Sequence, residues 1–335
     1  MRNTLYLIIS YILLGFFPAA AQGLVNVKHY SVKDGLSQNT VQGVLQDNEG
    51  YLWMATWNGL EKFDGYSFKN YKTYPTDKVK LQYNRLVNLQ LGGNQMLVCQ
   101  SYDRKVYLFD MRRECFEDVF AYHPEVKPCD AASKIVSLPN GIVWIVDANG
   151  DLWRIDCYRY KDKGGVTYLP VHSDAERKRY VFTVSLDVWG NEWVLTSKGY
   201  WVYGKDTLKG NEAYRYAVSV GNRFFVADIG KKLMEYSPEK GLCPVRLSCP
   251  AKDIRQLVSL SGGLLGIVMK RNFTVYHPAD GKSVSLFLDE SQEDFQPDYI
   301  FQDSKKNIWI QNRLKHIVKL DSECRRADFL DYPRR

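Results

Sequence analysis

The chain has 335 residues, enough for one large domain or two ordinary ones, and aromatic residues make up 14% of it. Flat aromatic rings pack well on a pleated sheet, and few stretches keep a 3.6-residue apolar period, so the composition favours an all-β chain. The formal net charge is +7, but no basic run with interleaved aromatic residues occurs, which argues against a nucleic-acid partner.

The first 21 residues have the pattern of a secretory signal peptide. Arg2 gives a positive start, residues 4–17 are almost wholly apolar, and Ala19 and Ala21 provide a cleavage site of small residues. The alternative is an uncleaved anchor helix, but the apolar stretch is short for a span that needs about 20 residues. We therefore expect an exported, periplasmic mature chain of residues 22–335 with no membrane span.

The clearest local pattern lies in residues 45–71. Short strand-like segments are separated there by Asn48-Glu49-Gly50, Asn58-Gly59 and Asp64-Gly65. Asn-Gly and Asp-Gly favour the positive φ angles of hairpin turns, so the segment predicts a four-stranded antiparallel meander. A lone small sheet cannot bury both of its faces, so the chain is expected to repeat this unit.

Six weaker copies of the unit follow along the chain. Each has a Gly or Asn turn before a strand with a central large residue, although Gly stands there in the sixth copy. The seven marker positions are Trp53, Leu97, Trp144, Trp193, Phe225, Gly266 and Trp309. A four-stranded unit that recurs at about 40–50 residues is typical of a β-propeller blade. Residues 22–335 therefore predict a single seven-bladed β-propeller; a β-sandwich or two small β domains are the alternatives.

Two terminal segments compete to close the ring. Residues 26–31 read as an outer strand that would join the last blade, and residues 327–332 could serve as the same strand. Only one of them can hold this position, and the sequence leaves open which one closes the ring and so removes the exposed sheet edges.

Residues 33–71 resemble the two-component regulator propeller repeat. The residues that carry the resemblance are Gly35-Leu36-Ser37, Val41, Gln46-Asp47, Gly50, Leu52-Trp53, Thr56, Asn58-Gly59-Leu60, Phe63-Asp64-Gly65 and Phe68. This segment is similar in particular to the first blade of periplasmic sensor regions in hybrid two-component systems of glycan-degrading bacteria. The resemblance implies a sensor that continues into a second propeller, a membrane helix and a cytoplasmic histidine kinase, all outside these 335 residues.

The sequence holds no pattern that predicts catalysis, a metal site or a cofactor. The five His residues form no HExxH and no pair at ligand spacing, and residues 147–151 imitate only the first positions of a calcium loop. A propeller glycosidase needs carboxylates that converge on the central axis. The first strand of each copy is apolar or carries amides, as in residues 135–138, 183–186, 217–220 and 257–260, so we expect a packed axis.

A candidate ligand-binding rim lies on the turns between second and third strands and on the loops between blades, since loops carry function in such folds. Its members share a polar, aromatic or cationic side chain: Trp57, Asn58, Tyr102, Arg104, Asn149, Arg179, Tyr180, Lys198, Lys231, Arg271 and Arg313. Cations pair with sulfate or carboxylate, and aromatic rings stack on sugars, so an acidic oligosaccharide is the expected ligand. The alternative is an ordinary solvated surface of a mildly basic protein.

Two functions from different classes remain. The first is a non-enzymatic periplasmic sensing module for glycan utilisation, whose partners would be an oligosaccharide and a second propeller or a dimer mate. The second is a stand-alone secreted propeller, either a carbohydrate-binding scaffold or a carbohydrate-active enzyme. Seven Cys residues at irregular spacing do not form a disulfide framework, and several are expected to be buried thiols.

Overall fold

The computed structural model describes a large part of the chain. The described residues are 30–170, 180–209, 213–228, 232–247, 253–269, 272–287, 297–303, 305–312, 316–320 and 327–331. The predicted signal peptide lies outside them.

These residues form seven four-stranded antiparallel sheets, each built from four consecutive strands. Blade 1 contains β1 (Val41–Gln46), β2 (Leu52–Thr56), β3 (Gly59–Phe63) and β4 (Phe68–Tyr71). Blade 2 contains β5 (Leu86–Leu91), β6 (Met96–Ser101), β7 (Val106–Asp110) and β8 (Cys115–Glu117), and blade 3 contains β9 (Ala132–Ser137), β10 (Ile142–Asp147), β11 (Leu152–Asp156) and β12 (Val166–Leu169). Blade 4 contains β13 (Val181–Leu186), β14 (Glu192–Thr196), β15 (Gly199–Val202) and β16 (Lys205–Lys209).

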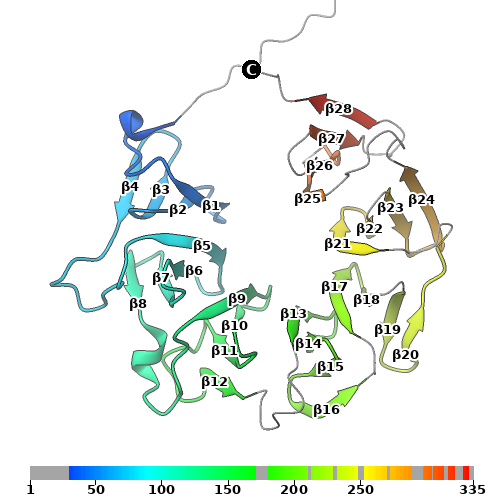
Figure 1. Ribbon diagram of the computed structural model, residues 1–335, viewed down its shortest axis with the longest axis horizontal. Coiled ribbons are helices and arrows are strands. Elements are labelled where there is room, and N and C mark those ends of the chain that lie inside the picture. The colour runs from blue at the N-terminus through cyan, green and yellow to red at the C-terminus, as the bar shows by residue number, and fades with distance from the viewer. Residues whose placement is uncertain are drawn as a thin grey trace, which may run out of the picture.

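Blade 5 contains β17 (Tyr214–Val220), β18 (Arg223–Asp228), β19 (Leu233–Ser237) and β20 (Gly241–Pro244). Blade 6 contains β21 (Ile254–Leu260), β22 (Leu264–Met269), β23 (Asn272–His277) and β24 (Lys282–Phe287), and blade 7 contains β25 (Pro297–Gln302), β26 (Ile308–Asn312), β27 (His316–Leu320) and β28 (Ala327–Asp331). Two short 3₁₀ helices, η1 (Val32–Asp34) and η2 (Val119–Tyr122), lie outside the sheets. Figure 1 shows the blades in chain order around a common centre with their first strands innermost, so the fold is a β-propeller.

The predicted markers all lie in second strands, from Trp53 in β2 to Trp309 in β26. Trp53, Trp144 and Trp193 are at most 1% exposed. Gly266 takes the marker place in β22 because a Cβ there would lie 3.1 Å from the Phe273 ring, which fills the same space. Six hydrophobic clusters join consecutive blades within the described residues, from blades 1 and 2 to blades 6 and 7. The core therefore lies between the sheets.

Every innermost strand carries a register shift near its beginning. One residue there has no partner on the second strand, which is the pattern of a β-bulge. The residues left unpaired are Gln42, Val87, Ser133, Phe182, Arg215, Arg255 and Asp298. Bulges bend a strand and redirect its side chains, so this ring of bulges shapes one end of the central axis.

The tail forms β28 and pairs antiparallel with β27 as the fourth strand of blade 7. Residues 26–29 lie outside the described residues, and Tyr30 packs on blade 1, with its ring 5.0 Å from Phe63 and 5.8 Å from Phe68. Of the two terminal segments, the tail therefore supplies the outer strand of blade 7.

Candidate functional site

The turns between second and third strands lie on one face together with the loops between blades. In an antiparallel meander the second strand ends where the first begins, so both kinds of connection meet at the same end of each sheet. We call this surface the entry face. It is the face on which the sequence places the ligand-binding rim.

The β2–β3 turn holds Trp57 in a fixed position on the entry face. Thr56 Oγ1 donates to Gly59 O at 2.9 Å and accepts from Asn58 N at 3.0 Å. Gly59 has a φ of 104°, and a Cβ there would lie 2.4 Å from Tyr71 O, so no larger residue fits. The turn is rigid, and it leaves Trp57 40% exposed.

Three loops of blades 1 and 2 bring Trp57 into one group with Tyr83, Arg85 and Tyr102, which we call the rim cluster. The Arg85 guanidinium lies 5.3 Å from the Trp57 ring centroid and 6.0 Å from that of Tyr102. The Tyr83 and Tyr102 rings are 6.5 Å apart in an edge-to-face arrangement. Tyr102 N donates to Arg85 O at 2.8 Å, which fixes the β6–β7 turn against the loop between the blades.

The rim cluster exposes a large apolar surface around one cation. Tyr83 is 47% exposed and Tyr102 is 59% exposed. Within the described part of the chain, Arg85 stacks on aromatic rings and forms no ion pair with a carboxylate. A guanidinium held in this way keeps its N–H groups available to a ligand, and the rings offer flat faces on which a sugar can stack.

Asp103 lies next to the rim cluster, but its carboxylate is bonded within its own turn. Asp103 Oδ1 accepts from Ser101 Oγ, and its Oδ2 is buried without a hydrogen-bond partner in the structure. Arg104 has a φ of 65°, and its carbonyl accepts from Ala132 N at 2.9 Å, which connects this turn to blade 3. Both residues shape the β6–β7 turn and take no part in the stacking.

The other predicted rim residues are not gathered into this group. Each of three others donates its backbone N–H within its own turn. Asn58 N donates to Thr56 Oγ1, Asn149 N donates to Asp147 Oδ1, and Lys198 N donates to Thr196 Oγ1. Tyr180 lies elsewhere on the entry face, with its ring 5.2 Å from Phe182. The remaining four predicted residues lie outside the described residues: Arg179, Lys231, Arg271 and Arg313. Tyr83 was not predicted, and the signal for it is its place two residues before Arg85 in a loop between blades.

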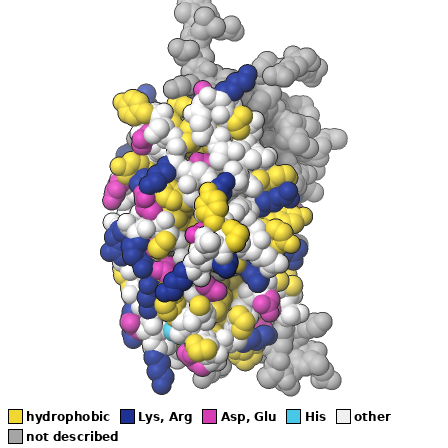
Figure 2. Space-filling model, turned by 90° about the vertical axis from the view of Figure 1, so that its left-hand side faces the viewer, with side chains coloured by type: hydrophobic (Ala, Val, Ile, Leu, Met, Phe, Trp, Pro, Cys, Tyr) yellow, Lys and Arg dark blue, Asp and Glu magenta, His cyan; other side chains and the backbone are white. Residues whose placement is uncertain are grey.

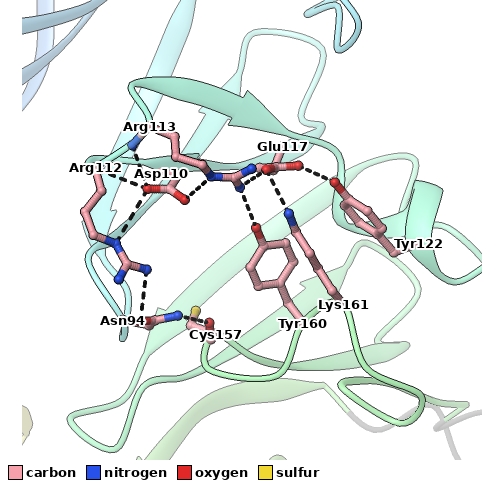
Figure 3. Close-up of polar contacts among 9 residues, drawn as sticks. All are labelled: Asn94, Asp110, Arg112, Arg113, Glu117, Tyr122, Cys157, Tyr160 and Lys161. Atoms are coloured by element: carbon pink, nitrogen blue, oxygen red, sulfur yellow. Dashed lines mark hydrogen bonds and ion pairs between the residues drawn. The ribbon is translucent and has the colours of Figure 1, made fainter.

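A second polar group, on the outer edge of blades 2 and 3, is a structural brace (Figure 3). The Arg113 guanidinium donates hydrogen bonds to Asp110 and Glu117. Glu117 also accepts hydrogen bonds from Lys161 Nζ and Tyr122 Oη. Burial alone would raise the pKa of Glu117, but the bonds from Tyr122 and Lys161 lower it below its ordinary value. All these charges already have partners, so the brace joins the blades and leaves nothing free for a ligand.

The outer edge on the side of blades 1 to 3 carries mixed charge (Figure 1 and Figure 2). Figure 2 shows Lys and Arg side chains interspersed with Asp and Glu over the blades seen at the left of Figure 1. A cavity of about 520 Å³ opens there between blades 1 and 2, and Glu114 on its wall is bonded to Lys69 and Tyr71. Within the described residues, no group of three or more His, Cys, Asp or Glu side chains is placed to hold a metal ion.

The comparisons agree with the resemblance seen in blade 1. Residues 35–58 match the family described as "Two component regulator propeller". A 54-residue segment is 44% identical to histidine kinase P4 of Formosa agariphila and spans 16% of this chain and 4% of that protein. The chain thus carries a two-component regulator propeller repeat.

Two solved structures show the same fold at low identity. One is the extracellular domain of BT4673 from B. thetaiotaomicron, assigned to a hybrid two-component system, with a TM-score of 0.52, 18% identity, and coverage of 83% of this chain and 38% of that one. The other is virginiamycin B lyase from Staphylococcus aureus, with a TM-score of 0.51, 15% identity, and coverage of 88% of this chain and 95% of that one. The chain therefore resembles extracellular sensor domains of hybrid two-component systems in both repeat and fold. Among the described residues, no helix has the length and hydropathy to cross a membrane.

Proposed function

We propose that the chain is an exported ligand-recognition module of a two-component sensor for glycan utilisation, and that the rim cluster binds a sugar ring of its oligosaccharide ligand. One observation carries the proposal: Trp57, Tyr102 and Arg85 converge from three loops and remain exposed. Exposed aromatic groups gathered around one cation are typical of a binding surface.

The chemistry of the cluster favours a hydroxyl-rich ligand with a negative group. The faces of Trp57 and Tyr102 suit the apolar face of a pyranose ring, and the Arg85 guanidinium suits a carboxylate or sulfate. The resemblance to sensor domains supports a signalling role. In this role, ligand binding would shift the arrangement of the propeller against a second propeller or a dimer partner.

Titration calorimetry with neutral and uronic-acid oligosaccharides tests the proposal. We expect Trp57→Ala to weaken binding about two- to ten-fold, since an aromatic contact contributes about 0.5–1.5 kcal/mol. We expect Arg85→Gln to remove most of the preference for the acidic ligands. Trp189→Ala is the matched control, because Trp189 is 46% exposed but lies in the β13–β14 turn on the opposite face.

Two results would contradict the proposal. If none of the oligosaccharides binds, the rim cluster is not a sugar site. If the acidic and neutral ligands bind equally, the preference for a negative group is wrong. Loss of binding in the Trp189 control would show that the effect of Trp57→Ala is not local.

A further inference from the structure

A cavity of about 340 Å³ opens at one end of the central axis, where the sequence predicts a packed core. Its walls come from the beginnings of four consecutive innermost strands, β9, β13, β17 and β21. Figure 1 shows these strands side by side around the centre of the ring. Because first strands begin at the entry face, the cavity opens on that face. The expectation of a closed axis is therefore wrong at this end.

The ring of bulges creates the cavity. Phe182 and Arg215 are the unpaired bulge residues of β13 and β17, and each lines the cavity together with the residue that follows it, Thr183 and Tyr216. In a regular strand, successive side chains point to opposite faces, so neighbours could not share one wall. A bulge breaks this alternation and turns both side chains toward the same space.

The charge of the cavity has one sign. Lys134 and Arg215 supply two cations, and the lining residues include no Asp or Glu. Lys134 Nζ donates to the carbonyl of Phe182, and the Arg215 guanidinium lies 5.6 Å from the Phe182 ring and 5.8 Å from that of Tyr216. Within the described residues, neither cation forms an ion pair with a carboxylate, although ten pairs of a Lys or Arg with an Asp or Glu occur elsewhere there.

The two cations lie close enough to affect each other. Desolvation in the cavity and the charge of Arg215 lower the pKa of Lys134 below its ordinary value. An anion placed between the two groups would oppose this lowering, because an opposite charge favours the protonated lysine. The same geometry accommodates a charge-assisted hydrogen bond from each cation.

The rest of the wall suits a small ring. Tyr180, Phe182 and Tyr216 supply aromatic surface, and Thr183 and Gln256 supply a hydroxyl and an amide. The volume lies at the lower end of the range of about 300–1,000 Å³ for small-molecule sites, which fits a ligand of roughly one ring.

We propose that this cavity is a separate binding site for an oxyanion carried on a sugar-sized ring, held by Lys134 and Arg215 against the Phe182 and Tyr216 rings. A carboxylate and a sulfate share the chemistry that these cations recognise, and the experiment distinguishes them. The proposal does not rest on the rim cluster, which lies on blades 1 and 2.

Isothermal titration with glucuronate, glucose 6-sulfate and glucose tests the site in the whole chain. We expect saturable binding of at least one of the two anions and at least about ten-fold weaker binding of glucose, since charged hydrogen bonds contribute about 1.5–3 kcal/mol each. The anion that binds more tightly identifies the group that the site prefers.

Variants then locate the binding. Lys134→Gln and Arg215→Gln should each weaken the preferred anion about ten-fold or more. Lys198→Gln is the matched control, because Lys198 is an exposed lysine on the entry face outside the cavity. Lys134→Arg and Arg215→Lys keep the charge and should retain much of the binding, which separates a lost cation from a damaged fold. Trp189→Ala should leave the affinity unchanged, because Trp189 lies in the β13–β14 turn on the opposite face.

The site is overturned if neither anion binds better than glucose, or if both glutamine variants bind the preferred anion as the parent does. It is also overturned if Lys198→Gln weakens binding as much as they do. A failure of Trp57→Ala to affect oligosaccharides, with anion binding intact, would reject the rim cluster and leave this site standing.

Discussion

The indole Nε1 of Trp53 donates to Asp47 Oδ2 at 2.7 Å. The other carboxylate oxygen of Asp47 accepts from Glu49 N and Tyr51 N in the turn between β1 and β2. One acid thus joins the turn to a fully buried ring in the second strand. The same arrangement recurs in blade 4, where Trp193 donates to Asp187 at 2.8 Å, and in blade 7, where Trp309 donates to Asp303 at 2.9 Å.

Replacing this acid should destabilise blade 1. Asp47→Ala removes the acceptor for three donors and leaves the indole N–H without its partner, which costs about 1–3 kcal/mol. Urea unfolding followed by Trp fluorescence measures the loss. Glu49→Ala is the control, because the Glu49 side chain is exposed in the same turn. Equal midpoints for the two variants would contradict the role assigned to Asp47.

A buried ion pair joins blades 3 and 4. Arg154 Nη2 donates to Glu192 Oε1 at 2.7 Å, Arg154 Nε donates to Oε2 at 2.9 Å, and Trp144 Nε1 donates to Oε2 at 2.7 Å. Arg154→Ala leaves the Glu192 carboxylate buried without its cation, so we expect a loss of about 3–5 kcal/mol in the free energy of unfolding.

The double variant Arg154→Met, Glu192→Gln should be less destabilised than Arg154→Ala, because it removes both charges and keeps an acceptor for the Trp144 indole N–H. Arg112→Ala, at a cation whose side chain is 56% exposed, should change stability little. A double variant that loses more than the single one would show that the charged pair itself is required.

Acid should break the hydrogen bond from the Trp309 indole to Asp303 in blade 7. The hydrogen bonds from Asn307 and Trp309 lower the pKa of Asp303 from 3.8 to about 2. Because the pKa is lower in the folded state, the contribution of Asp303 to stability is complete above the unfolded value and disappears as the pH falls toward about 2. The indole N–H resonance of Trp309, assigned with Trp309→Phe, should shift over this range. In Asp303→Asn the shift should be absent, and a shift that persists would contradict the assignment.

Three free thiols should resist modification in the folded protein. Cys99, Cys129 and Cys157 are at most 4% exposed, and burial raises the pKa of Cys129 and Cys157 to about 12. The reactive thiolate is therefore scarce near neutral pH. A chain with serine at Cys115, Cys243, Cys249 and Cys324 isolates these three. It should react with Ellman's reagent only when denaturant opens the blades, and rapid reaction without denaturant would contradict their burial.

The local part of the fold could be predicted from the sequence. Hairpin turns such as Asn58-Gly59 and buried rings such as Trp53 are specified by neighbouring residues, so the repeat and its second-strand markers are confirmed. The expected buried thiols are confirmed for Cys99, Cys129 and Cys157.

The sites could be predicted less well, because they depend on contacts between blades. Trp57 and Tyr102 were predicted separately, but only the fold places Arg85 between them. Lys134 and Arg215 were missed because a bulge interrupts the alternation at the beginning of each first strand. The predicted strands therefore began after them, at residues 135 and 217.

Each blade completes its hydrogen-bonded ladder from four consecutive strands. Every backbone pairing in the described sheets thus joins neighbours along the chain, so a blade can form from about 40 residues without waiting for a distant segment. A blade built from consecutive strands can be duplicated or deleted as a whole without breaking the strand pairing of any other blade. The architecture therefore lets the number and character of entry-face loops change in evolution while the pairing within each sheet stays the same.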